Sequence, residues 1–461
     1  MATRTTKTQP PQTREASSSS QQSSSPCFYK LSAGELPDDL YQKEATRSDW
    51  IGPILGSSND DGGGGGGTSE QDDLPSWMET SSDPSGFSPG ALHRVIPIDR
   101  ILELERCIGI TTYMVGNVSP FALPLLAVAW LVVGLESARY AFGFLLVYHG
   151  GLYLIWRMVL VPIFRKRYNC RTKLTDELDP SDPAYSQYLY TERNITKYCS
   201  TSYVWPKTLQ WPALQESPND DRPVIYCVIP HGLCPYGIVG YPYFSKVWNS
   251  KVCSWTCAPV LLKLPVVGHY LRAIGYVPAK SQPILEALTK KDRNVGVVLD
   301  GIDGMFRNAG GNVNGVDTEV AAIGNRKGIV KIALRANAAL VPVYGFGHTL
   351  CYDVWVDPFG ILRYLSAKLG VSLTPFFGRY KWFLGPPKRE TPIVVCLGDP
   401  IYPPTSNNSN NNNHQSGEIT QDQIDEHHAR LLEGFRAVFE THKRGYYGAS
   451  AGARKQLIVC N

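Results

Sequence analysis

The feature that most constrains this chain is a long stretch without charge. No residue from Cys107 to Leu135 is charged, and a second uncharged run extends from Tyr140 to Trp156. Roughly 20 apolar residues span a bilayer, so the first run is long enough and the second lies near the lower limit. We therefore predict a membrane hairpin at residues 107–160. A re-entrant hairpin, or two buried helices of a soluble core, are the alternatives that this pattern leaves open.

Positive charges flank the uncharged runs on both sides. Arg94, Arg100 and Arg106 precede the first run, and Arg157 and Arg165–Arg167 follow the second. Because basic residues favour the cytosolic side of a membrane, we expect both flanks of the hairpin to be cytosolic. The 11 cysteines form no paired spacing, which favours reduced thiols. The net charge of +4 gives no case for a nucleic-acid partner.

The rest of the chain divides into two low-complexity segments and one globular domain. Residues 1–90 contain serine, glutamine and glycine runs, and residues 406–417 are rich in asparagine, so we predict a disordered tail and a disordered insert. Residues 170–448 alternate short β-rich runs with helical segments, which predicts an α/β domain with helices around a sheet. The expected strands and helices are Val224–Ile229, Val295–Leu299, Ala339–Tyr344, Ile393–Leu397, Ile284–Lys291, Lys327–Ala336 and an amphipathic helix that ends near Gly445.

A histidine follows the first of these strands, in the sequence Ile229-Pro230-His231-Gly232. An imidazole at the carboxyl end of a strand is well placed to act as a general base, because its ordinary pKa lies close to neutral pH. A structural histidine bonded to the main chain is the alternative. Cys234 lies three residues further on, and we interpret it as a buried thiol rather than a nucleophile.

Two further segments carry chemically useful residues. Asp300 and Asp303 lie on a glycine-rich turn after the strand at 295–299, where a carboxylate could orient a histidine or bind a cation, although a plain turn needs the same residues. The segment Asn325–Arg335 carries four cations and an apolar stripe, and Lys327 and Lys331 share a face of the expected helix. Such a helix could hold phosphates or lie on a charged membrane, or it could be a solvated basic face.

These segments, in this order, resemble the acyl-CoA:diacylglycerol acyltransferase type 2 family, which includes monoacylglycerol and wax-alcohol acyltransferases. The resemblance covers roughly Pro97 to Gly448 and rests on an N-terminal hydrophobic hairpin followed by PHG, RKGIVKIALRANAALVPVYGFG, FFGRYKWFLGPP, GDPIYPP and IDEHHARLLEGFRAVFETHKRGYYG. It implies a glycerolipid-acyltransferase-like mixed sheet flanked by helices. It also implies an enzyme of the endoplasmic reticulum membrane, or of lipid droplets, whose active site faces the cytosol.

The resemblance assigns roles residue by residue. It implies that His231 is the catalytic base, with Gly232 beside it, and it maps the family's RKGF block to Arg326, Lys327, Gly328 and Ile329. We expect this basic segment to contact acyl-CoA through Arg326, Lys327, Gly328 and Lys331. The implied substrates are acyl-CoA as co-substrate and the free hydroxyl of diacylglycerol, with no metal and no other cofactor. A monoacylglycerol or long-chain alcohol acceptor, or a non-catalytic lipid-droplet protein, are the alternatives, and the sequence is compatible with a monomer or an oligomer.

The chain departs from the family pattern at two positions and from the pattern of the wider glycerolipid acyltransferases at a third. Ile229 stands where animal members carry histidine and plant members glutamate. Gly304 stands where the family turn carries glutamate, so we expect either that Asp300 or Asp303 takes over this role or that it is lost. Tyr236 stands where the wider glycerolipid acyltransferases carry the aspartate that follows their histidine, which argues against a lysophosphatidate-type enzyme.

Overall fold

The structure of this chain is a computed structural model. It describes residues 28–36, 76–83, 86–96, 190–209, 222–238, 251–263, 271–308, 317–370, 372–383, 385–404 and 419–461, together with residues 134, 139–140, 143, 146–147, 151 and 268.

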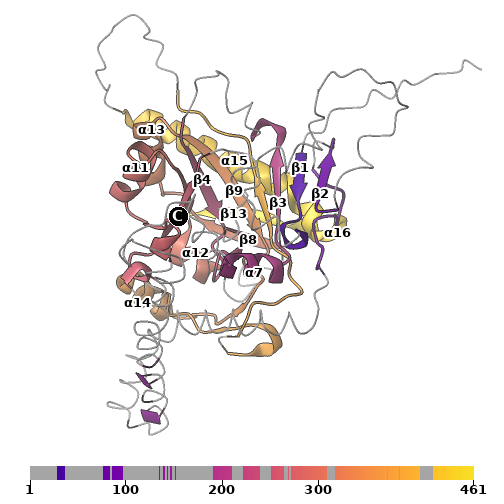
Figure 1. The fold of residues 1–461 in the computed structure, drawn as a ribbon, viewed down its shortest axis with the longest axis vertical. Helices are drawn as coiled ribbons and strands as arrows, with labels where there is room; N and C mark the ends of the chain where they lie inside the picture. Colours follow the sequence, from indigo (N-terminus) through magenta and orange to yellow (C-terminus); the bar gives the residue numbers. More distant parts are fainter. Residues whose placement is uncertain are drawn as a thin grey trace, which may run out of the picture.

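A nine-stranded mixed sheet forms the centre of the molecule (Figure 1). Its strands, in spatial order, are β2 (Met78–Ser81), β1 (Phe28–Leu31), β3 (Ser202–Pro206), β12 (Val394–Leu397), β9 (Ala339–Phe346), β4 (Val224–Ile229), β7 (Asn294–Val298), β5 (Cys253–Cys257) and β6 (Val277–Pro278). The five strands from β9 to β6 are parallel to one another, whereas β12 is antiparallel to β9 and parallel to β3. The prediction of an α/β domain with a mixed sheet is confirmed.

Both faces of the sheet are buried, which explains why its central strands are continuously apolar. In β4, Ile225, Cys227 and Ile229 point into one core and Val224, Tyr226 and Val228 point into the other, as the two-residue period of a strand requires. The first core also contains side chains of α11 (Ser281–Thr289), α13 (Gly328–Ala336) and α15 (Gln421–Tyr447), and the second contains side chains of α7 (Tyr190–Tyr198) and the 3-10 turn η4 (Tyr236–Ile238).

The helices form where the sequence pattern predicts them. Helix α13 buries Ile329, Val330 and Ala333 and ends at Asn337, which adopts the left-handed conformation at φ 48°. Helix α15 begins with a capping box in which Thr420 and Gln423 each accept a hydrogen bond from the other's main-chain N–H.

The globular domain extends beyond its predicted end at residue 448. After α15 the chain forms α16 (Ala449–Arg454) and β13 (Gln456–Cys460), and β13 pairs in parallel with β8 (Thr318–Ala322). The predicted boundary is therefore wrong. The apolar residues of the C-terminal segment form a strand because β8 presents a free edge to it.

The prediction that residues 1–90 are disordered throughout is also wrong. Strands β1 and β2 pair with each other, and β1 adds to the edge of the sheet at β3. Tyr29, Leu31 and Met78 enter the core, while Lys30 is buried and forms a salt bridge with Glu79 at 2.8 Å. A short apolar segment within low-complexity sequence becomes ordered here because an existing sheet edge pairs with its main chain.

The predicted membrane hairpin and the predicted insert fall largely outside the residues that the structure describes. Within the described residues, no helix combines the length and the apolar character needed to cross a bilayer. The hairpin predicted at 107–160 lies almost entirely outside those residues, as does the insert at 406–417. Further elements are α12 (Gly301–Arg307), α14 (Ile361–Leu369), β10 (Asp353–Val354) and β11 (Phe376–Phe377).

Candidate active site

Three neighbouring parallel strands end at one edge of the sheet, and each is followed by a polar residue. Ile229 of β4 pairs with Tyr344 of β9, and Val228 of β4 pairs with Val298 of β7. The carboxyl ends of parallel strands form the edge at which α/β proteins bind ligands. The chain therefore delivers His231 after β4, Asp300 after β7 and His348 after β9 to the same edge.

His231 has one ring nitrogen engaged and one available. Its Nδ1 lies 3.0 Å from the carbonyl oxygen of Gly232. Because a carbonyl oxygen can only accept, Nδ1 carries the hydrogen, and Nε2 retains its lone pair. Burial lowers the pKa of His231 below its ordinary value of 6.5, so the ring is neutral at pH 7. This tautomer and charge state are those that a general base requires.

The loop that carries His231 is closely packed at Gly232. Gly232 has a φ of +60°, and a Cβ atom at this position would clash with the main-chain carbonyl of His348. Among the described residues, the N–H groups of Gly232 and Leu233 donate to no acceptor. Two main-chain donors thus lie next to the imidazole without a partner in the part of the chain that the structure describes.

Asp300 supports the loop through its main chain rather than through the imidazole ring. Its Oδ2 accepts a hydrogen bond from the main-chain N–H of His231 at 3.1 Å. The side chain is fully buried, and Oδ1 has no hydrogen-bond partner among the described residues. Burial raises the pKa of Asp300 to about 7, while the amide of His231 and the charge of Arg326 act in the opposite direction. The carboxyl group therefore titrates near neutral pH.

Gly304 creates the space that the Asp300 carboxyl group occupies. A Cβ atom at position 304 would clash with Oδ2 of Asp300. The glycine-rich turn predicted at 300–304 is the beginning of helix α12, with Asp300 at its N-cap and Asp303 in its first turn, where Asp303 forms salt bridges with Arg307 at 2.7 Å and with Arg363 at 3.5 Å. Asp300 is therefore the carboxylate that the fold brings to His231, and Asp303 is a partly exposed ion-pair residue.

His348, which the sequence reasoning missed, fastens the two ends of the His231 loop. Its Nδ1 donates to the carbonyl oxygen of Pro230 at 3.0 Å, and its Nε2 accepts from the N–H of Gly237 at 3.0 Å. The ring fits because Gly237 and Gly345 have no side chains, and a Cβ atom at Gly345 would clash with it. Burial lowers the pKa of His348 to about 4, so it stays neutral. A histidine directly after a strand, in GFGH, is the signal that could have identified it.

The basic block lies at the beginning of α13. Arg326 is exposed, donates to the carbonyl of Ala322 at 2.9 Å, and extends toward α12, where a Cβ atom at Gly301 would lie 3.6 Å from its Nη1. Lys327 forms a salt bridge with Asp425 at 2.8 Å. The structure thus brings Arg326 next to the carboxylate turn, while Lys327 contacts α15. Gly328 and Lys331 are exposed on the same helix.

Among the described cysteines, Cys234 is the one that follows His231 most closely in the sequence, and its thiol is not activated for nucleophilic attack. Burial raises the pKa of Cys234 to about 12, so its thiolate is not populated at neutral pH. Tyr236 is buried and shares a hydrogen bond with Tyr352 at 2.6 Å. The neighbourhood of His231 therefore offers an uncharged base rather than a covalent nucleophile.

The structure defines a mixed α/β domain that carries a neutral histidine at the carboxyl ends of its central parallel strands. Residues 183–457 match the model of the diacylglycerol acyltransferase family, and the chain belongs to this family. No solved structure matches the chain.

Curated relatives carry three related names. A 2-acylglycerol O-acyltransferase 1 from Bos taurus is 29% identical over 48% of this chain and 64% of its own length. A diacylglycerol O-acyltransferase 1 from Eremothecium gossypii is 25% identical over 53% of this chain and 55% of its own length. A human acyl-CoA wax alcohol acyltransferase 1 is 27% identical over 48% of this chain and 67% of its own length. The chain spans less than two thirds of the length of the first two relatives.

Proposed function

We propose that this protein transfers a fatty acyl group from acyl-CoA to the free hydroxyl of diacylglycerol and forms triacylglycerol. The observation that carries the proposal is His231, whose Nδ1–H donates to the carbonyl of Gly232 and leaves a neutral Nε2 available at the ligand-binding edge of the sheet. Family membership and the names of the relatives support the choice of thioester and lipid alcohol as substrates.

The reaction needs one proton carrier. His231 Nε2 takes the proton of the lipid hydroxyl as its oxygen forms a bond to the thioester carbonyl, a contribution of about 10²- to 10⁴-fold. The oxyanion that develops needs donors, and the unpaired N–H groups of Gly232 and Leu233 are the candidates. Collapse of the intermediate breaks the carbon–sulfur bond, and the imidazolium returns the proton to the sulfur of coenzyme A. The chemistry requires acyl-CoA as co-substrate and no further cofactor.

The proposal extends to the binding of acyl-CoA and to the location of the enzyme. Arg326 is the cation best placed for a coenzyme A phosphate, because it lies beside the turn that carries Asp300. Lys327, Gly328 and Lys331 extend this surface along α13. We place the enzyme in the endoplasmic reticulum membrane, or on lipid droplets, with a hairpin at 107–160 and the active site facing the cytosol.

Two alternatives are separated by experiment. A monoacylglycerol or long-chain alcohol acceptor uses the same chemistry, and the names of two relatives favour testing both. A non-catalytic lipid-binding role is favoured by Gly304, which stands where the family turn carries glutamate. That support is weakened, because the Asp300 carboxyl group fills the space above Gly304.

The test uses the full chain in microsomes of a yeast strain that lacks neutral-lipid synthesis. We expect triacylglycerol from labelled acyl-CoA, and we expect the His231→Ala variant to lose at least about 10²-fold of this activity. His428→Ala is the matched control, since His428 is a buried histidine on α15 whose Nε2 lies 3.3 Å from the carbonyl oxygen of Ile323 and which, among the described residues, forms no hydrogen bond with His231, Asp300 or His348. Normal activity of His231→Ala would remove His231 from the mechanism, and a wild-type chain inactive with every acceptor would refute the enzyme.

A further inference from the structure

Exposed apolar side chains gather in one segment of the described chain. Nine of the 14 exposed large hydrophobic side chains among the described residues lie between positions 355 and 383. We call this set the apolar surface; it consists of Trp355, Val356, Phe359, Ile361, Tyr364, Leu369, Tyr380, Trp382 and Phe383. A soluble monomer rarely exposes so many large apolar groups together, so the set indicates an interaction surface.

Helix α14 carries apolar side chains on both sides, because Leu362 and Leu365 are half-buried while further apolar residues point outward. Ser366 is its buried residue, and Ser366 Oγ accepts a hydrogen bond from the N–H of Leu373 at 2.9 Å. Ile361, Tyr364 and Leu369 point outward and are 59–66% exposed. A helix packed on a protein core normally presents polar side chains on its outer side. The exposed apolar residues therefore indicate that the outer side of α14 contacts something less polar than water.

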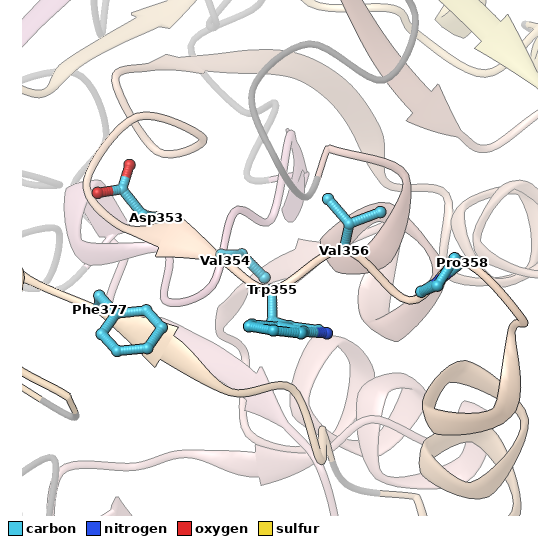
Figure 2. A pocket seen from close by; sticks show the side chains of 6 residues that line it. All are labelled: Asp353, Val354, Trp355, Val356, Pro358 and Phe377. Carbon is cyan, nitrogen blue, oxygen red and sulfur yellow. The ribbon is translucent and has the colours of Figure 1, made fainter.

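The neighbouring strands continue this apolar character. Strands β10 and β11 pair with each other, and beside them lies an open groove of about 440 Å³ whose lining side chains are apolar except for Asp353. Figure 2 shows the ring of Trp355 beside that of Phe377, with Val356 and Pro358 following along the chain. The rings of Tyr380 and Trp382 lie 5.7 Å apart. Tyrosine and tryptophan are the residues enriched where proteins meet lipid headgroups.

The charges around the apolar surface favour an anionic partner. Five cations of residues 353–388 face the carboxylates Asp353 and Asp357, together with Asp303 and Glu390, which form salt bridges with two of the cations, so the net charge is +1. The cations are Arg363, Lys368, Arg379, Lys381 and Lys388. A second copy of this surface would bring the same excess of positive charge against it, whereas phospholipid headgroups would neutralise it.

We propose that the apolar surface is a docking face for an anionic phospholipid surface, separate from the hairpin predicted at 107–160. Lysine and arginine side chains place their charges among the headgroups, and the aromatic and aliphatic groups enter the acyl boundary. Helix α14 packs against α12 and is joined to it by the salt bridge between Arg363 and Asp303 at 3.5 Å (Figure 1). Asp300 immediately precedes α12 and accepts a hydrogen bond from the main chain of His231. Binding of α14 to the lipid surface therefore holds His231 close to the membrane that supplies the acceptor, a consequence that rests on the proposed function.

The experiment places a photoreactive p-benzoylphenylalanine in the full chain, in microsomes with radiolabelled phospholipid. The probe replaces Tyr364 on α14 or, as the control, Arg436, which is exposed on α15. We expect a phospholipid adduct at position 364 and none at 436. The double substitution Ile361→Ser with Leu369→Ser removes only exposed side chains, and it should reduce the adduct at 364 by at least about tenfold.

Other products would overturn the proposal. An adduct between position 364 and residues 107–160 would show that the chain covers its own surface, and an adduct between two copies would show an oligomer interface. Absence of any adduct would show a surface facing water. The same yields are expected in a His231→Ala background, so a failure of the catalytic proposal and a failure of the lipid surface give different results.

Discussion

Burial of Asp300 makes the protein less stable as the pH rises, and the size of this effect follows from the pKa of its carboxyl group. Its pKa is about 7 in the folded protein, against an ordinary value of 3.8. Because the folded pKa is raised, the contribution of Asp300 to stability is fully present below pH 3.8 and is lost as the pH rises through 7. The complete loss is about 4 kcal/mol, of which about 2 kcal/mol has already been lost at pH 5.

The substitution Asp300→Asn tests this calculation. The amide is neutral at every pH and its oxygen can still accept from the N–H of His231. Relative to the wild type, we expect the free energy of unfolding to rise by about 2 kcal/mol at pH 5 and by about 4 kcal/mol at pH 8. The measurement is denaturant unfolding of the purified full chain in detergent at both values.

The control is Asp303→Asn, which changes a partly exposed, ion-paired carboxylate three residues away. Its effect should stay below about 1 kcal/mol at either pH. Equal gains for Asp300→Asn at pH 5 and pH 8 would refute the reasoning, because they would show that Asp300 is ionised in the folded protein at both.

Three further predictions concern the His231 loop. The substitution His348→Phe removes both hydrogen bonds of the His348 ring, and steady-state kinetics should show kcat at least about tenfold lower with little change in KM for acyl-CoA. The variant His348→Gln retains a donor and an acceptor and should recover part of the loss. A change confined to KM would contradict a positioning role. The substitution Gly304→Ala should destabilise the protein by about 1–3 kcal/mol, because the added methyl group clashes with Asp300. A double-mutant cycle should find a smaller destabilisation in an Asp300→Ser background. Equal destabilisation in the two backgrounds would exclude the contact. Because the pKa of His231 is lowered from 6.5, the acid limb of kcat/KM should lie below that pH, and a limb above it would indicate a charged ring in the resting protein.

Much of the fold could be predicted because its determinants are local. Strand β4 occupies the predicted residues, and β7, β9 and β12 differ from the prediction by one or two residues at their ends. The apolar runs that are buried on both faces identify the central strands without any knowledge of their neighbours. Strands β1 and β13 could not be predicted in this way, because each becomes a strand only through pairing with a partner distant in the sequence.

The candidate site was predictable to the same degree. His231 and Asp300 each follow an apolar strand directly, so their position at a sheet edge is visible in the sequence. His348 was missed because its two hydrogen bonds join residues 118 and 111 positions apart. The choice between Asp300 and Asp303 was also open, since the two acids are three residues apart in the sequence, and only the tertiary structure shows that Asp300 packs against Gly304 while Asp303 forms salt bridges.

The sequence by itself determined the strand–turn pattern, the chemical groups at the strand ends and the membership of a lipid acyltransferase family, since these depend on residue type and spacing. The tertiary structure alone decided that β9, β4 and β7 are neighbours, that His348 holds the loop and that Asp300 rather than Asp303 supports His231. It also decided the protonation of these groups, because the free energy of a charge depends on the water and the dipoles around it and not on its position in the chain.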